Sequence, residues 1–209
     1  MGKPSLILIG AGGHARACID VVDLQGDFAI AGLVGRRDEL NTRHLGYEVV
    51  ATDDELPALA HAYGYALVAV GQIRSPDTRI RLYQRVRELD WRLAVVVSPT
   101  AYVSKSAELG PGTIVMHGAV INAGAKVGSN SIVNSRALIE HDARIGDHCH
   151  ISTGAILNGD VQVDEGSFIG SGAVVREGVT IGRHSVIGMG AVVRKNQPHR
   201  TLSVSGSEE

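Results

Sequence analysis

The chain of 209 residues has few aromatic side chains: two phenylalanines, five tyrosines and one tryptophan. Beyond residue 100 only Tyr102 and Phe168 remain, whereas most of the 26 glycines lie there. Aromatic side chains fill much of a conventional hydrophobic core. The second half must therefore pack with small and aliphatic side chains, and the two halves are predicted to be built differently.

The chain also lacks an excess of one charge, a cysteine framework and a long apolar run. Its 20 basic and 22 acidic side chains give a formal charge of −2, which argues against nucleic acid or an anionic membrane as the main partner. Two cysteines, Cys18 and Cys149, are too few for a disulfide framework. No apolar run approaches the ~20 residues of a membrane span, and the N-terminal sequence has no small-residue cleavage site. We expect a cytoplasmic protein with reduced thiols and no transmembrane segment.

The second half carries an internal repeat of six residues. Every sixth residue from Val103 to Val193 is aliphatic, and every sixth residue from Ala107 to Ala191 is no larger than valine. Because side chains alternate along a strand, each repeat supplies two inward side chains and a turn, and three repeats close one coil. The pattern predicts a triangular parallel β-helix over residues 99–195, followed by a C-terminal tail over 196–209.

The first half alternates between apolar runs, which predict buried strands, and stretches typical of helices. Asp53, Asp54 and Pro76 suit helix N-termini. The predicted strands are Leu6–Ile9, Ala29–Val34, Ala66–Val70 and Leu93–Val97, and the predicted helices run to Leu24 and over Asp53–His61 and Pro76–Leu89. Residues 1–98 are thus predicted to form a small α/β domain with a Rossmann-like parallel sheet.

A glycine-rich loop joins the first strand to the first helix. Gly10, Gly12 and Ala15 satisfy the pattern G-x-G-x-x-A, which lets backbone N–H groups approach a diphosphate at a helix N-terminus. A tight turn without a ligand is the alternative. The second strand ends at V-G-R-R (34–37), where an NAD-binding domain carries an acid. Arginines there would suit a 2′-phosphate, so an NADP-binding domain is a further alternative. Against it, a domain of fewer than 100 residues leaves little room for the second mononucleotide-binding half.

His141 stands two residues after an inward aliphatic position, so it projects from a turn of the predicted β-helix. A neutral imidazole there would take a proton from an amine or hydroxyl that attacks a thioester, and the flanking Glu140 and Asp142 would orient the ring and raise its basicity. A solvated turn histidine is the alternative. His150 stands nine residues later, at the last position of the next hexapeptide and on a neighbouring side of the prism. Both histidines are therefore expected to line one groove between subunits.

His117, His148 and His184 are predicted to be surface turn residues. Their spacing does not favour a metal site, because His148 and His184 share a column two coils, or about 10 Å, apart. Zinc binds imidazole nitrogens at ~2.0–2.1 Å. We expect no metal; a metal hydrolase like the hexapeptide-repeat carbonic anhydrases is the alternative, with ligands converging from different subunits.

The motifs together resemble one family. G-A-G-G-H-A from Gly10, V-G-Q from Val70, the hexapeptides, I-E-H-D from Ile139 and H-I-S-T-G-A from His150 are similar to the sialic-acid O-acetyltransferase-like family of hexapeptide-repeat acyltransferases. This family includes the UDP-4-amino-sugar N-acetyltransferases of bacillosamine-type pathways. The resemblance implies a left-handed β-helix, a homotrimer, and transfer of acetyl from acetyl-CoA to the 4-amine of a UDP-linked amino sugar in bacterial surface glycan or nonulosonic acid biosynthesis.

Residue by residue, the resemblance implies His141 as the catalytic base, Asp142 as the residue that raises its basicity, and Glu140 as its neighbour. The implied contacts are to acetyl-CoA from His150, Ser171 and Met189, and to the nucleotide sugar from Gly12, Gly13, His14 and Gly71. Val34 and Gly35 replace the family's Asp-Asp pair, and residues 203–209 lack its V-x-G-x-P-A ending. The alternatives are an O-acetyltransferase of sialic or nonulosonic acid and a non-catalytic sugar-nucleotide-binding scaffold.

Overall fold

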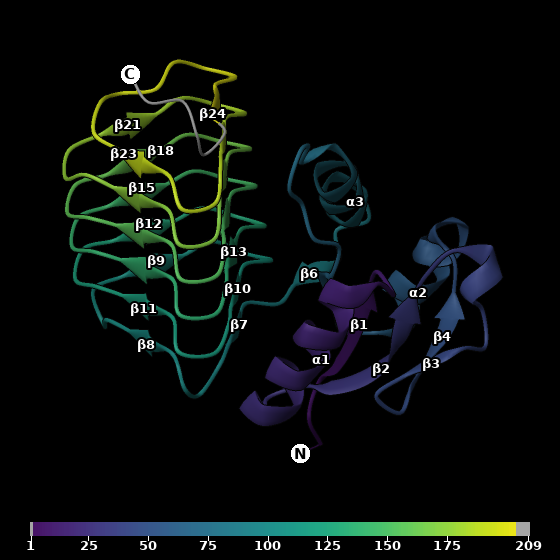
Figure 1. Cartoon of the computed structure of the whole chain (residues 1–209). Helices are drawn as coiled ribbons and strands as arrows, with labels where there is room; N and C mark the ends of the chain where they lie inside the picture. Colours follow the sequence, from purple (N-terminus) through teal and green to yellow (C-terminus); the bar gives the residue numbers. More distant parts are fainter. Residues whose placement is uncertain (1, 204–209) are drawn as a thin grey trace.

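The computed structural model describes residues 2–203, which form an α/β domain beside a prism of stacked coils (Figure 1). The elements of the α/β domain are β1 (Ser5–Ile9), α1 (Gly13–Gln25), β2 (Ala29–Val34), the short helix η1 (Arg37–Glu39), β3 (Arg43–His44), β4 (Tyr47–Ala51), the short helix η2 (Asp53–Glu55), α2 (Leu56–Ala62), β5 (Tyr65–Val68), α3 (Asp77–Glu88) and β6 (Arg92–Leu93).

The sheet of this domain has the strand order β3-β4-β2-β1-β5-β6, and only the β3–β4 pair is antiparallel. Helices cover both of its faces, which explains the unbroken apolar run of β1. Leu6 and Leu8 lie in the core cluster that contains α1, whereas Ile7 and Ile9 lie in the cluster that contains residues of α2 and α3. The predicted parallel α/β domain is confirmed.

The prism has three faces, each a parallel sheet. The domain face, which packs on the α/β domain, comprises β7 (Val96–Val97), β10 (Ile114–Val115), β13 (Ile132–Val133), β16 (His150–Ile151), β19 (Phe168–Ile169), β22 (Val186–Ile187) and β24 (Leu202–Ser203). The apolar face comprises β8 (Tyr102–Val103), β11 (Val120–Ile121), β14 (Leu138–Ile139), β17 (Ile156–Leu157), β20 (Val174–Val175) and β23 (Val192–Val193). The polar face comprises β9 (Glu108–Leu109), β12 (Lys126–Val127), β15 (Arg144–Ile145), β18 (Gln162–Val163) and β21 (Thr180–Ile181).

The interior of the prism is built from the two predicted columns. The aliphatic residues from Val115 to Val193 and the small residues from Ala119 to Ala173 form one buried cluster. From Gly112 to Gly190, every turn between faces places one residue in the left-handed region: in most turns either glycine or a residue such as Asn130, Asp142 or Asp160, whose φ values are 52°, 61° and 56°. Glycine, Asn and Asp adopt this conformation at low cost, which explains the glycine-rich composition.

The outward rows of the three faces differ in chemistry, and this difference gives the faces their names. The polar face presents charged and polar side chains outward, and the domain face is covered near its start by the α/β domain. The apolar face presents an uninterrupted apolar row, whose ends, Tyr102 and Val192, are each 58% exposed. The row comprises Tyr102, Val120, Leu138, Ile156, Val174 and Val192.

Three local features differ from the sequence-based expectations. The predicted strand Leu93–Val97 is wrong: β6 ends at Leu93 in the α/β sheet, whereas β7 begins the prism at Val96, because the backbone passes from one sheet to the other at Ala94. The β3–β4 hairpin was not predicted. Residues up to Ser203 add a further strand, β24, to the domain face, and the rest of the atypical C-terminal sequence, 204–209, lies outside the described residues.

Candidate active site

His141 lies in the turn between the apolar and polar faces, an edge of the prism that we call the His141 edge. Its Nδ1 is 3.0 Å from Oδ2 of Asp142. A carboxylate only accepts, so Nδ1 carries the hydrogen and Nε2 keeps a free lone pair. The hydrogen bond to Asp142 raises the pKa of His141 above its usual range, and the charges of Asp142, Glu140 and Asp160 act in the same direction.

The carboxylate of Glu140 is held away from the ring. It accepts hydrogen bonds from Asn122 Nδ2 at 2.9 Å and from the backbone N–H of His141 at 3.3 Å. Of the two acids beside His141, Asp142 therefore orients the imidazole, and Glu140 fixes the turn. Above them, a cavity of about 540 Å³ runs along the His141 edge; its lining is Glu140, His141, Asn158, Gly159, Asp160, Glu177 and Gly178.

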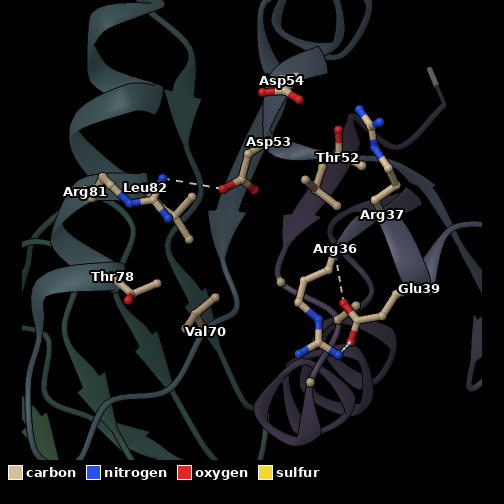
Figure 2. Close-up of a pocket in the computed structure, with 15 residues that line it drawn as sticks. Arg36, Arg37, Glu39, Thr52, Asp53, Asp54, Val70, Thr78, Arg81 and Leu82 are labelled. Atoms are coloured by element: carbon tan, nitrogen blue, oxygen red, sulfur yellow. Dashed lines mark hydrogen bonds and ion pairs between the residues drawn. The ribbon is translucent and has the colours of Figure 1, made fainter.

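A second cavity, of about 560 Å³, lies at the carboxyl ends of β1, β2 and β5 (Figure 2). In open α/β sheets ligands bind at this end of the strands. Gly10 has a φ of 130°, and a Cβ there would stand 2.9 Å from Val70 Cγ2, so only glycine fits. Gly12, which precedes the first turn of α1, has open space around it. The N–H of Gly10 donates to the carbonyl oxygen of Val34 at 2.8 Å, so the N–H groups that suit a diphosphate are those of the first turn of α1, next to Gly12.

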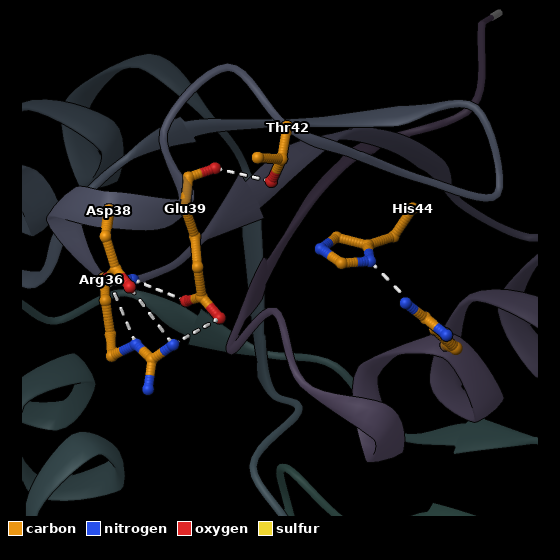
Figure 3. Close-up of polar contacts among 6 residues, drawn as sticks. Arg36, Asp38, Glu39, Thr42 and His44 are labelled. Carbon is orange, nitrogen blue, oxygen red and sulfur yellow. Dashed lines mark hydrogen bonds and ion pairs between the residues drawn. The ribbon is translucent and has the colours of Figure 1, made fainter.

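Charged side chains also line this cavity: Arg36, Arg37, Asp53 and Arg81 come from three elements (Figure 2). The guanidinium of Arg36 pairs with Asp38 and Glu39, both at 3.3 Å. Figure 3 shows these contacts and the neighbouring pair of His44 with Arg16. Val34 and Gly35, at the positions of the family's acidic pair, and the two arginines that follow them therefore form part of the wall of the cavity.

His14, Gly71 and His150 meet where the α/β domain packs on the domain face of the prism. The imidazole rings of His14 and His150 are 6.5 Å apart, and a Cβ on Gly71 would be 3.5 Å from His14 Cβ. His150 Nδ1 donates to the carbonyl oxygen of Gln72 at 2.7 Å. Burial lowers the pKa of His150 to about 4 and that of His14 to about 3, so both rings are neutral at neutral pH.

Ser171 and Met189 occupy the edge between the domain face and the apolar face, which we call the Ser171 edge. Met189 is 69% exposed, and Ser171 Oγ is 2.9 Å from Ser152 Oγ. The backbone along this edge is open, because a Cβ on Gly172 or Gly190 would meet nothing within 4 Å. This edge is therefore an open track of backbone along the prism.

The structure does not bring all the predicted site residues together within one chain. His14, Gly71 and His150 lie at the domain junction, whereas Gly12 lines the cavity of the α/β domain and Gly13 follows it as the first residue of α1. His141 lies on the edge opposite the domain face of the triangular prism, and the α/β domain covers one side of the prism only (Figure 1). A groove lined by both His141 and His150 therefore needs a second copy of the chain.

Of the three histidines expected in exposed turns, His148 is buried and His117 is half-buried. The prediction for His148 is wrong: it is only 7% exposed, because Tyr83 of the α/β domain packs edge-on against its ring and Asn130 contacts its Nδ1 at 2.9 Å. His117 is half-buried and links the two parts of the molecule, with Nε2 2.8 Å from Asp20 Oδ2 and Nδ1 2.8 Å from Ser98 Oγ. His184 is exposed as predicted.

Within residues 2–203, no group of three or more His, Cys, Asp or Glu side chains is arranged to hold a metal ion. Over the same residues, no helix has both the length and the apolar character needed to span a membrane.

Sequence reasoning missed Arg79, a fully buried residue at the junction of the α/β domain and the prism. The available signal was its position on α3, where Arg79 continues the buried stripe formed by Leu82, Tyr83 and Val86.

Comparisons with known proteins agree with this architecture. Residues 5–86 match the family model described as PglD N-terminal domain, and residues 160–195 match bacterial transferase hexapeptide (six repeats). PerB from Caulobacter crescentus, solved with CoA and GDP-perosamine, is 35% identical with a TM-score of 0.87, covering 95% of this chain and 92% of that chain. The acetyltransferase domain of PglB from Neisseria gonorrhoeae is 32% identical with a TM-score of 0.86, covering 94% of each chain.

A more distant neighbour, WeeI from Acinetobacter baumannii, is 22% identical with a TM-score of 0.82, covers 93% of this chain and 94% of that chain, and shows the shared fold. No curated protein sequence matched the chain significantly. The chain is a hexapeptide-repeat acyltransferase with a left-handed parallel β-helix. The features that define this class are the Rossmann-like α/β domain, the hexapeptide prism joined to it and the histidine on the edge of the prism. Within that class, the chain belongs to the family of nucleotide-amino-sugar N-acetyltransferases, as the sequence resemblance predicted.

Proposed function

We propose that this chain is an acetyl-CoA-dependent N-acetyltransferase that acts on the amine of a nucleotide-linked amino sugar. The observation that carries the proposal is the His141–Asp142 pair, in which Nδ1 is bound to the carboxylate and Nε2 is free. The cavity at Gly10 and Gly12 supports the assignment of a nucleotide substrate, because the first turn of α1 begins beside it and the N–H groups of a helix N-terminus suit a diphosphate. Relatives of the same family were solved with CoA and GDP-perosamine or with acetyl-CoA.

The proposed reaction uses His141 as a general base. The amine nitrogen attacks the thioester carbonyl carbon while His141 Nε2 accepts a proton from it. The C–N bond forms, the C–S bond breaks, and the proton passes from His141 to the departing thiolate of CoA. Asp142 stabilises the imidazolium that forms in between, and His150 and the Ser171 edge hold acetyl-CoA.

A homotrimer is part of the same proposal. The uncovered apolar row from Tyr102 to Val192 is the kind of surface that associates with another copy. A single chain also holds His141 on the edge opposite the nucleotide cavity. Assembly covers the apolar row, and it also brings His141 of one copy to the sugar held by the α/β domain of its neighbour. The prediction of a cytoplasmic location belongs to this proposal.

The experiment is a CoA-release assay over a panel of GDP-linked and UDP-linked amino sugars, with mass spectrometry of the product. GDP is included because PerB was solved with GDP-perosamine, and UDP because the sequence resemblance implies it. We expect N-acetylation of at least one member, and loss of most turnover in His141→Ala with acetyl-CoA binding kept. Structures of the Caulobacter enzyme with a histidine replaced by asparagine or alanine still hold CoA and GDP-perosamine, which supports this expectation.

The same panel separates the alternatives. Acetylation of free sialic acid in place of any nucleotide sugar would point to the O-acetyltransferase. Binding of nucleotide sugars without any CoA release would point to a non-catalytic scaffold. Unchanged kcat in His141→Ala would contradict the proposed mechanism.

A further inference from the structure

Arg79 lies on α3 at the junction between the α/β domain and the prism, and its partners are all carbonyl groups. The side chain is fully buried. Its Nη1 donates to the carbonyl oxygens of Val68 and Val70 at 2.6 and 2.8 Å, and its Nε donates to that of Asn130 at 2.9 Å. None of the ion pairs between the described residues includes Arg79.

A buried guanidinium without a carboxylate partner is a costly way to fill this space. Leu82, Tyr83 and Val86 fill the rest of the same helical stripe with apolar or aromatic side chains. Desolvation lowers the pKa of Arg79 only to about 10, so the side chain is still charged at neutral pH. Its presence is therefore explained by what its hydrogen bonds hold in place.

What they hold is the loop that follows β5. Val70, bound by Arg79, is followed directly by Gly71, which packs against His14, and by Gln72. Gln72 bonds to the prism twice, from its Nε2 to the carbonyl oxygen of His148 and through its own carbonyl oxygen to His150 Nδ1, both at 2.7 Å. The loop is thus fixed at one end by Arg79 and at the other by the prism.

The ring of His150 depends on this loop for its orientation and its tautomer. The hydrogen bond to the Gln72 carbonyl places the hydrogen on Nδ1, and Nε2 then accepts from Asn134 Nδ2 at 3.1 Å. Burial is the main cause of the lowered pKa of His150, and the positive charge of Arg79 adds to it. The same charge acts on His14. Arg79 therefore favours neutral rings on both sides of the junction.

We propose that Arg79 is a positioning residue for acetyl transfer: its guanidinium ties the Gly71–Gln72 loop to the prism and thereby holds the ring of His150 against acetyl-CoA. This inference rests on the proposed function, which assigns His150 to the acetyl-CoA site. Arginine is needed because a planar fork reaches three carbonyl oxygens at once, whereas lysine offers a single donor atom.

The test compares Arg79→Met and Arg79→Lys with Arg87→Met, a control at an exposed position of the same helix. The first readout is steady-state kinetics with acetyl-CoA and the nucleotide amino sugar. The second is the imidazole Nδ1–H proton resonance of His150 in ¹⁵N-labelled protein, assigned by its loss in His150→Gln. We expect Arg79→Met to lose on the order of tenfold to a hundredfold in kcat/KM for acetyl-CoA. The His150 signal should broaden or shift.

The kcat/KM of Arg79→Lys for acetyl-CoA should lie between those of Arg79→Met and the wild type. If Arg79→Met does not fold, Arg79→Lys is the variant that tests the proposal. Wild-type kinetics and an unmoved His150 signal in a folded Arg79 variant would overturn the proposal. If the wild type acetylates no nucleotide amino sugar, the proposed function fails. The resonance of His150 still decides in that case whether Arg79 holds the ring.

Discussion

The imidazole of His141 lies directly over Gly159, its counterpart in the next coil of the prism. A Cβ on Gly159 would stand 2.7 Å from His141 Nε2 and 2.8 Å from its Cε1. Gly154 and Gly178, in neighbouring turns, have positive φ and nothing within 4 Å of such a Cβ. Gly159 does not have a positive φ, so here glycine makes room for the ring of His141, the proposed base, rather than for the backbone.

Gly159→Ala should therefore damage catalysis without damaging the fold. The methyl group would displace the His141 ring, and small displacements of a catalytic group reduce rates by about tenfold to a hundredfold. We expect kcat to fall within this range while the melting temperature stays close to that of the wild type. Gly64→Ala is the matched control, because Gly64 also lacks a positive φ and its nearest atom would be 3.8 Å away. Wild-type kcat in Gly159→Ala would show that the ring does not need this position.

The contact between Asp142 and His141 predicts a pH dependence. The base must be neutral to accept a proton, so kcat/KM should fall as the pH drops through the pKa of His141, which Asp142 raises. Asp142→Asn keeps a residue that tolerates the φ of 61° but removes the charge. The acidic limb of the profile should move to lower pH and kcat should fall.

Glu140→Gln is the comparison for Asp142→Asn. Glu140 acts on the pKa of His141 only through its charge, since its carboxylate bonds to Asn122 and to backbone. The acidic limb should therefore move in the same direction but less. An unmoved limb in Asp142→Asn, measured from pH 5 to 9, would contradict the assignment of His141 as the base.

The buried rings of His14 and His150 predict loss of stability in acid. Their pKa values are lowered to about 3 and about 4 in the folded state, whereas an unfolded histidine titrates near 6.5. The stability that each neutral ring contributes is complete above pH 6.5. It is lost as the pH falls from there towards the folded pKa, by up to about 1.4 kcal/mol per pH unit for each histidine. Urea unfolding at pH 7, 6 and 5, all at one protein concentration, should show the free energy of unfolding falling with this slope. The slope should be smaller in His150→Gln. An equal slope in that variant would contradict the explanation.

The apolar face predicts the effect of a charge at its centre. Ile156 is part-buried in the outward apolar row, and a carboxylate there would have to be buried when copies associate. Ile156→Glu should be monomeric by light scattering and inactive, while its circular dichroism stays that of the wild type. Gln162→Glu on the polar face is the control and should leave assembly unchanged. A trimeric Ile156→Glu would show that another surface holds the copies together.

Much of the fold could be predicted from the sequence because it follows from local periodicity. The columns that contain Val115 and Ala119 fill the prism interior as the six-residue repeat requires. Gly10 and Gly12 occupy the loop that their spacing indicates. The change from the α/β sheet at Leu93 to the prism at Val96 could not be predicted, because one apolar run contributes strands to two different sheets.

The candidate site was less predictable because it depends on contacts between distant segments. Both Glu140 and Asp142 flank His141, and only the left-handed φ of Asp142 and the contact of Glu140 with Asn122 decide which acid meets the ring. The burial of His148 depends on Tyr83 of the other domain. Arg79 contacts carbonyl groups, which no side-chain pattern indicates.

The central claim is that His141 of one copy acts on a sugar held by the α/β domain of another. His141→Ala removes the base, and Gly12→Phe fills the nucleotide cavity at a position with open space and an ordinary φ of −82°. Each variant alone should be inactive. The decisive measurement is CoA release by assemblies in which the two variants are co-expressed. Random mixing in a closed ring leaves about a quarter of the sites intact, so about a quarter of wild-type turnover is expected. Turnover no greater than the sum of the two variants alone would contradict the account.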